Sequence, residues 1–315
     1  MSPEVASQAG TRPSSPLSFS FGPRKSGAEV AHACGASRLT EQRRRARHPT
    51  ALKPGSIWTK LASLLFLIYF FLTSLVVGFP VCVCLWILHM FYDNKRRWLL
   101  HRWTTTWAYH YNTVNPCIHC TTLAGLHNLA MVHAGKPVIF VANHQSALDI
   151  FLLYGINAHF KWVSKSSNFN IPLIGWAMSL NDYVPVTRGR KESVVRMFDH
   201  CKRQLSNCNS IMIFPEGTRN VDGGLKPFKP GAFQLAIDTQ TTIIPLVLNG
   251  TSDIFSGRSI VGFFNGGGCD LTVKALEPID PSEFGKDVEA LCSRVREAMS
   301  RGLEESCMLG LEKAA

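Results

Sequence analysis

The chain has 315 residues, of which 46% are hydrophobic and 17% are charged, and its formal net charge is +11. This length accommodates one substantial domain with appendages or two small domains, and the charge calls for an anionic partner such as nucleic acid or lipid headgroups. The ten cysteines argue against a secreted disulfide protein, since Cys82 and Cys84 lie inside the most apolar stretch, and reduced thiols facing the cytosol are the simpler interpretation.

Residues 1–56 are rich in Ser, Pro, Gly, Ala and Arg and show no apolar periodicity. They carry nine basic and three acidic side chains, which is over half of the net charge. We predict a disordered tail, because such a composition buries too little apolar surface to offset the entropy of ordering. The excess of Arg and Ser resembles an organelle transit peptide, whereas the cluster Arg43–Arg47 also fits a plain tail that contacts anionic lipid.

An apolar segment follows, Leu61–Tyr92, with no Asp, Glu, Lys or Arg in 32 residues. A single perpendicular membrane span needs only about 20 residues, and Gly78-Phe79-Pro80 interrupts the run near its middle. Because both flanks are basic, we predict that residues 57–97 form a membrane-embedded helical hairpin with both ends on the cytosolic side. The alternative is one tilted span of about 20–25 residues with an interfacial extension.

From Trp98 the pattern changes to alternating strands and helices, which predicts an α/β domain over residues 98–304 with a mixed sheet flanked by helices. Residues 305–315 are predicted to be a C-terminal tail. The expected strands are Val138–Ala142, Lys161–Ser164, Tyr183–Thr187, Ser210–Phe214, Thr242–Asn249 and Asp270–Ala275, and the expected helices are Ser146–Gly155, Ser193–Asn207, Gly231–Thr239 and Pro281–Glu304.

The sequence Asn143-His-Gln-Ser-Ala-Leu-Asp149 directly follows a predicted strand, the usual place for catalytic loops in open α/β sheets. His144 can accept a proton near neutral pH, and the carboxylate of Asp149 can fold back to hold the other imidazole N–H. An alternative is purely structural: Ser146-x-x-Asp149 also matches a capping box that begins a helix.

A second polar loop, Phe214-Pro-Glu-Gly-Thr-Arg219, follows the strand Ser210–Phe214 in the same way. Gly217 allows the backbone to approach a ligand closely, and the planar guanidinium of Arg219 suits a phosphate. A surface turn with an exposed arginine is the alternative.

Other signals are weaker. The spacing of Cys117, His119 and Cys120 lacks a second ligand pair, so we predict partly buried thiols and interfacial histidines and no metal. Asn249-Gly250-Thr251 matches a glycosylation acceptor but ends a predicted buried strand, so we expect a turn. The chain contains no G-x-S-x-G elbow of a serine hydrolase.

These motifs together resemble the glycerophospholipid acyltransferases, most closely the 1-acylglycerol-3-phosphate acyltransferases. The resemblance covers roughly residues 98–280 and includes four blocks in order. The matching residues are Asn143, His144, Ser146 and Asp149 in the first block, Lys165, Pro172, Gly175 and Arg188 in the second, Phe214–Arg219 in the third, and the apolar strand Ile243–Leu246 in the fourth.

The resemblance implies that His144 takes the proton of the sn-2 hydroxyl of lysophosphatidic acid while Asp149 orients it. The hydroxyl oxygen then attacks the carbonyl of an acyl thioester, either acyl-CoA or acyl carrier protein, and no metal or redox cofactor is needed. The substrate-binding residues implied are Asn143, Ser146, Lys165, Arg188, Glu216, Gly217, Thr218 and Arg219.

Alternative functions are an acyltransferase acting on glycerol-3-phosphate or another lysophospholipid, and a non-catalytic membrane scaffold. Nucleic acid is not expected as a partner, because the basic tail lacks interleaved aromatics and adjoins the membrane segment. We expect a cytosol-facing membrane protein of the endoplasmic reticulum, with a plastid or another organelle membrane as the alternative.

Overall fold

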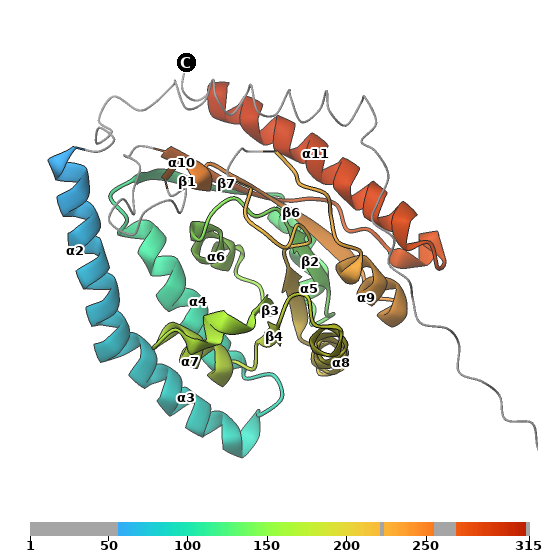
Figure 1. Ribbon diagram of the computed structural model, residues 1–315, viewed down its shortest axis with the longest axis horizontal. Coiled ribbons are helices and arrows are strands. Elements are labelled where there is room, and N and C mark those ends of the chain that lie inside the picture. The colour runs from blue at the N-terminus through green and yellow to red at the C-terminus, as the bar shows by residue number, and fades with distance from the viewer. Residues whose placement is uncertain (1–55, 221–223, 255–268, 313–315) are drawn as a thin grey trace, which may run out of the picture.

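The computed structural model describes residues 56–220, 224–254 and 269–312 (Figure 1). The predicted tail of residues 1–56 therefore lies outside the described residues, apart from Ser56.

A seven-stranded mixed sheet forms the centre of the α/β domain, with the strand order β1-β7-β6-β2-β5-β3-β4. Neighbouring strands are parallel except for β6 and β7, which are antiparallel. The strands are β1 (Ile118–Ala124), β2 (Ile139–Ala142), β3 (Phe160–Lys165), β4 (Val184–Val186), β5 (Ser210–Ile213), β6 (Ile243–Asn249) and β7 (Cys269–Ala275).

Helices cover both faces of this sheet (Figure 1), because its central strands are apolar on both sides. In β2, Phe140 and Ala142 join a core with α4 (Trp98–Thr113) and α6 (Leu148–Leu153). The alternate residues Ile139 and Val141 join the core on the other face. That second face is covered by α8 (Lys191–Ser206), α9 (Gly231–Thr239) and α11 (Val288–Glu312). The predicted α/β class and flanking helices are confirmed.

Shorter helices connect these elements. They are η2 (Leu126–Leu129), α5 (Ala130–His133), η3 (Tyr154–Ile156), η4 (Ser166–Asn170), α7 (Ile174–Leu180), α10 (Thr251–Ile254) and η5 (Pro281–Phe284).

The predicted tail after residue 304 is wrong for residues 305–312, which continue α11. Ser306 is buried there and donates its hydroxyl to the carbonyl of Gly302 at 2.8 Å, so packing extends the helix past the end of its clear apolar pattern. Helix α4 and strand β1 were not predicted, because their many polar residues weaken the apolar periodicity.

The apolar segment is one continuous helical run, and the predicted reversal at Gly78–Pro80 is wrong. Helix α2 (Ile57–Thr73) passes through a π-helical turn, η1 (Ser74–Gly78), into α3 (Phe79–Tyr92). Phe79 keeps a helical conformation and donates its N–H to the carbonyl of Ser74, five residues back. Pro80 lies in the first turn of α3, so this wide turn accommodates its missing N–H without breaking the helix.

The chain reverses instead at the polar residues 93–97. Arg97 adopts a left-handed conformation with φ of 54°, and the Asp93 carboxylate accepts the N–H groups of Arg96 and Trp98. Helix α4 then runs back beside α2 and α3, where Tyr111 packs on Phe70 with ring centroids 4.6 Å apart. A helical hairpin therefore exists, but its arms are α2–α3 and α4.

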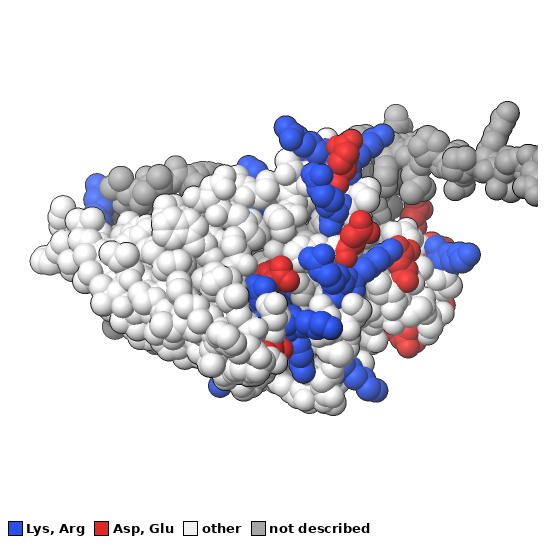
Figure 2. All heavy atoms as spheres, turned by 90° about the horizontal axis from the view of Figure 1, so that it is seen from below, with Lys and Arg blue, Asp and Glu red and all other residues white. Residues whose placement is uncertain are grey.

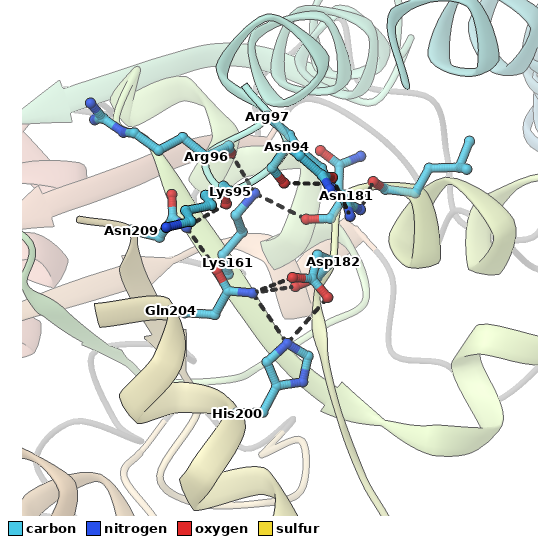
Figure 3. A network of polar contacts seen from close by, with 11 residues as sticks. Asn94, Lys95, Arg96, Arg97, Lys161, Asn181, Asp182, His200, Gln204 and Asn209 are labelled. Carbon is cyan, nitrogen blue, oxygen red and sulfur yellow. Dashed lines mark hydrogen bonds and ion pairs between the residues drawn. The ribbon is translucent and has the colours of Figure 1, made fainter. Parts of the chain in front are cut away.

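A buried polar network holds this turn against the sheet (Figure 3). Lys161 of β3 is fully buried, and its Nζ donates to the carbonyls of Arg96 at 2.9 Å and Asn181 at 3.0 Å. Arg97 donates to the carbonyl of Leu180 at 2.5 Å, and Asn209 donates to that of Lys95 at 3.1 Å. Burial, with the nearby Arg97 cation, lowers the pKa of Lys161 to about 7.

Candidate active site

The two predicted polar loops lie side by side at one edge of the sheet. They follow β2 and β5, which are parallel neighbours with Val141 opposite Ile213. The backbone N–H of Asn220 donates to the carbonyl of His144 at 2.7 Å, so the loops are joined directly. This edge carries the carboxyl ends of the parallel strands, where open α/β sheets bind ligands.

His144 and Asp149 form a hydrogen-bonded pair, with Nδ1 and Oδ2 2.7 Å apart. Asp149 is fully buried, whereas the imidazole remains 16% exposed. Because a carboxylate only accepts, a neutral imidazole at this position carries its proton on Nδ1 and its lone pair on Nε2. The pair therefore has the geometry of a general base with its orienting acid.

The carboxylate of Asp149 also caps its own loop. Its Oδ2 accepts the backbone N–H groups of Gln145 at 2.7 Å and Ser146 at 2.8 Å. Ser146 is buried, and its Oγ accepts the N–H of Leu148 at 3.3 Å. One carboxylate therefore both pairs with the imidazole and accepts the backbone N–H groups at the start of its own loop.

Aromatic rings fix the plane of the imidazole. Phe214 stacks on His144 with ring centroids 4.1 Å apart and an angle of 12° between the planes. Trp162 stacks on the far side of Phe214 at 5.4 Å, and its indole N–H donates to the hydroxyl of Tyr154 at 2.9 Å. The positioning role of Phe214 was not predicted, because its stacking depends on the register of β5 beside β2.

Glu216 holds the two loops together. Its carboxylate accepts the N–H of His144 at 3.1 Å and that of Lys226 at 3.0 Å, and the side chain is buried. Burial raises the pKa of Glu216 to about 7, although both N–H donors act in the opposite direction. Both of its oxygens thus contact protein backbone.

Asn143 likewise faces the protein. Its side-chain amide donates to the carbonyl of Leu248 at 2.9 Å and accepts the N–H of the same residue at 2.7 Å. The pairing ties the His144 loop to β6 on the other side of β2. The structure therefore places Asn143, Ser146 and Glu216, all expected from the resemblance to bind substrate, beneath the loops in supporting positions.

The remaining predicted residues reach the surface at the same edge of the sheet. Thr218 and Arg219 follow β5, Lys165 ends β3 and Arg188 follows β4, and all four are exposed. The three strands are consecutive in the sheet, so their carboxyl ends gather the cationic side chains on the side of the sheet where His144 lies.

Gly217 has φ of +69°, which a residue with a side chain rarely adopts. A Cβ there would also lie 2.8 Å from Cε of Lys229. The tight turn of this loop therefore depends on glycine at position 217.

Thr251 is a site residue that the sequence reasoning missed. It opens α10 immediately after β6, and its hydroxyl donates to Oδ1 of Asp149. The predicted turn at Asn249-Gly250 is present, with Gly250 at φ of +96°. The sequence carried one signal for it, namely that Thr251 comes two residues after the predicted strand Thr242–Asn249.

The cysteines considered for a metal lie at β1: Cys117 is buried just before it, and Cys120 is exposed on it. Within the described residues, no three His, Cys, Asp or Glu side chains are grouped closely enough to hold a metal ion.

Comparisons with known proteins identify the family. Residues 124–249 match the family model described as Acyltransferase. The chain is 32% identical over 254 residues to a 1-acyl-sn-glycerol-3-phosphate acyltransferase of Chlamydomonas reinhardtii, which covers 81% of this chain and 73% of that protein. It is 33% identical over 239 residues to the chloroplastic 1-acyl-sn-glycerol-3-phosphate acyltransferase LPAT1 of Arabidopsis thaliana, covering 75% of this chain and 61% of that protein.

The fold is also shared with a solved structure. The crystal structure of the 1-acyl-sn-glycerophosphate (LPA) acyltransferase PlsC from Thermotoga maritima matches with a TM-score of 0.62 and 24% identity, over 78% of this chain and 97% of that one. With the His144–Asp149 pair in place and a relative matched over most of both chains, this protein belongs to the 1-acyl-sn-glycerol-3-phosphate acyltransferase family.

Proposed function

We propose that this protein transfers a fatty acyl group from an acyl thioester to the sn-2 hydroxyl of lysophosphatidic acid, giving phosphatidic acid for phospholipid synthesis. The observation that carries the proposal is the His144–Asp149 pair at a sheet edge where exposed cations also gather. The names of the relatives support the choice of substrate.

In the proposed reaction, Nε2 of His144 takes the proton of the sn-2 hydroxyl as its oxygen attacks the thioester carbonyl. The tetrahedral intermediate collapses as the carbon–sulfur bond breaks, and the imidazolium returns its proton to the leaving thiolate. Asp149 stabilises the imidazolium through the 2.7 Å bond to Nδ1. Phe214 keeps the ring in one plane, so that Nε2 faces the same direction throughout.

The phosphate of the acceptor is proposed to bind the exposed cations around this base. Arg219 offers a bidentate guanidinium next to Thr218, and Lys165 and Arg188 add charge from the neighbouring strands. Asn143, Ser146 and Glu216 are assigned to holding the loop backbone, because their polar groups bond to it.

Membrane association is proposed to occur through α2 and α3. The run Ile57–Tyr92 has 36 residues, so it is about 54 Å long, whereas the hydrocarbon core of a bilayer is about 30 Å thick. One side packs on α4 and α7, with Phe79 beside Trp176 at 5.5 Å, and the other exposes apolar side chains. Figure 2 shows a broad region without charged side chains on this side of the molecule.

This shape favours a helix lying along one leaflet over a helix crossing both, because a crossing helix would carry the packed catalytic domain into the hydrocarbon. The acceptor and the product would then stay in the lipid layer. Each methylene group moved into water instead would cost about 0.8 kcal/mol.

We also propose an acyl donor and a compartment. The chloroplastic relative favours a plastid membrane, and with it acyl carrier protein as the donor. The endoplasmic reticulum with acyl-CoA is the alternative, so the assay must offer both donors.

The function is tested with membranes from a host lacking its own enzyme, containing wild-type protein or H144A. They are given labelled acyl-CoA or acyl carrier protein with lysophosphatidic acid, glycerol-3-phosphate or lysophosphatidylcholine. We expect phosphatidic acid from lysophosphatidic acid with wild type and none with the variant. Transfer to a different acceptor that still requires His144 would correct the substrate, and equal activity of the two proteins would contradict the catalytic assignment.

A further inference from the structure

We propose that Thr251 is a positioning residue for acyl transfer, acting through Asp149 on the orientation of His144. The inference rests on the proposed function, since it concerns the same base.

The hydrogen bonds to Asp149 divide between its two oxygens. Oδ2 accepts Nδ1 of His144 and the two backbone N–H groups of Gln145 and Ser146, all from the same loop. Oδ1 accepts the hydroxyl of Thr251, which comes from a different strand end more than a hundred residues later in the chain. Within the described residues, Thr251 is therefore the contact that fixes the Oδ1 side of the carboxylate.

Burial makes this bond difficult to replace. Asp149 and Thr251 are both fully buried, so bulk water does not reach their polar atoms in the folded protein. A charged group that loses a buried hydrogen bond keeps its desolvation cost without compensation. The carboxylate then rotates toward any remaining donor, and Oδ2 no longer points steadily at Nδ1.

The fold places the hydroxyl with little freedom. The double hydrogen bond between Asn143 and Leu248 locks β6 beside the His144 loop. Gly250, at φ of +96°, turns the chain directly after β6, and Thr251 starts α10. The relay Thr251–Asp149–His144 is thus held by two neighbouring strands rather than by one flexible loop.

The test compares T251V, which keeps the side-chain shape without the hydroxyl, with T251S, which keeps the hydroxyl. T241V is the matched control, because Thr241 is also buried and lies two residues before β6 begins, at the end opposite to Thr251. We expect T251V to lower kcat about tenfold or more with KM unchanged, since a base held less well loses part of its catalytic contribution. T251S should recover most of the activity, and T241V should resemble wild type.

A double-mutant cycle with D149N decides whether Thr251 acts through Asp149. We expect T251V to have no further effect on kcat in the D149N background, because the carboxylate that links Thr251 to His144 is already absent there. Equal losses in both backgrounds, or a folded T251V enzyme within twofold of wild-type kcat, would overturn the inference. An inactive wild-type enzyme would instead reject the proposed function, so the two failures are distinguishable.

Discussion

Single buried carboxylates in this protein each accept hydrogen bonds from more than one backbone N–H group. The arrangement of the loops around His144 depends on these bonds. Asp149 accepts two backbone N–H groups besides His144 and Thr251. Glu216 joins the His144 loop to the segment around Lys226. Buried residues thus carry these supporting contacts, whereas Lys165, Arg188 and Arg219 lie exposed at the same edge of the sheet.

The raised pKa of Glu216 predicts a pH dependence of stability. Its pKa rises from an ordinary 4.5 to about 7 on folding, so the folded state binds a proton that the unfolded state releases between these values. The stability contributed by this group is therefore full below pH 4.5 and is lost as pH rises through about 7.

The variant E216Q should remove the pH-dependent part of the stability that Glu216 contributes. This part is measured as the change in the free energy of unfolding between pH 4.5 and 7.5. The substitution should also lower stability by about 1–3 kcal/mol, because the glutamine NH₂ would face a backbone N–H donor. E283Q, at an exposed glutamate, is the control and should keep the wild-type pH profile. An unchanged profile in E216Q would contradict the assignment.

At the scale of elements, the junction between the apolar helices α2–α3 and the sheet depends on Lys161. This amine lies in β3 and holds the turn of residues 93–97, which connects α3 to α4 (Figure 3). Arg96, Arg97, Asp93 and Asp182 surround it, and burial is the main cause of its lowered pKa.

Lys161 should therefore make stability depend on pH in the alkaline range. Its pKa falls from 10.5 to about 7 on folding, so the unfolded state binds more protons between these values. Stability from this group is full above pH 10.5 and is lost as pH falls through about 7. We expect K161M to flatten the rise in the free energy of unfolding between pH 7 and 10. K202M, at a largely exposed lysine paired with Asp238, should leave that rise intact.

The contact between the apolar helix and α4 gives a second prediction for an element. Gly78 lies against Trp107, and a Cβ at position 78 would overlap the indole ring. We expect G78A to destabilise the protein by about 1–3 kcal/mol through overpacking, although alanine normally favours helices. G231A is the control, since its Cβ would meet Phe198 at an ordinary 3.7 Å and should change stability by less than about 1 kcal/mol. Thermal unfolding of both variants distinguishes the cases, and equal stability would refute the packing argument.

At the scale of the molecule, α2 and α3 form an apolar side of the part that the structure describes, and they pack on the α/β domain through α4 and α7. If this side enters the lipid, exposed apolar residues on α2 should carry the membrane affinity, whereas exposed apolar residues on α8 should not.

The double variant L65E/L72E changes two such residues on α2, and V194E/V195E changes two exposed residues on α8. We expect L65E/L72E to weaken binding to anionic vesicles by at least about a hundredfold, because each leucine that enters the lipid contributes about 1.5–3 kcal/mol to binding. V194E/V195E should float with vesicles as wild type does. An equal loss of vesicle binding in both double variants would contradict membrane association through α2 and α3.

The fold class and the position of the His144–Asp149 pair follow from local patterns in the sequence. Apolar strands such as Ile139–Ala142 and Ser210–Ile213, each followed by a polar loop, determine a buried sheet with its chemistry at one edge. His144 and Asp149 are five residues apart, so their pairing needs little more than the loop itself.

The remaining features depend on contacts between distant segments. The apolar composition of residues 61–92 predicts membrane attachment, but the π-helical turn at Ser74–Gly78 and the packing on α4 decide that the helix continues past Pro80. Thr251 and Phe214 join the site because strand order and register bring β6 and β5 beside β2. Sequence periodicity indicates which face of a helix or strand is buried. Pairing between strands far apart in the chain is decided only when the tertiary structure forms.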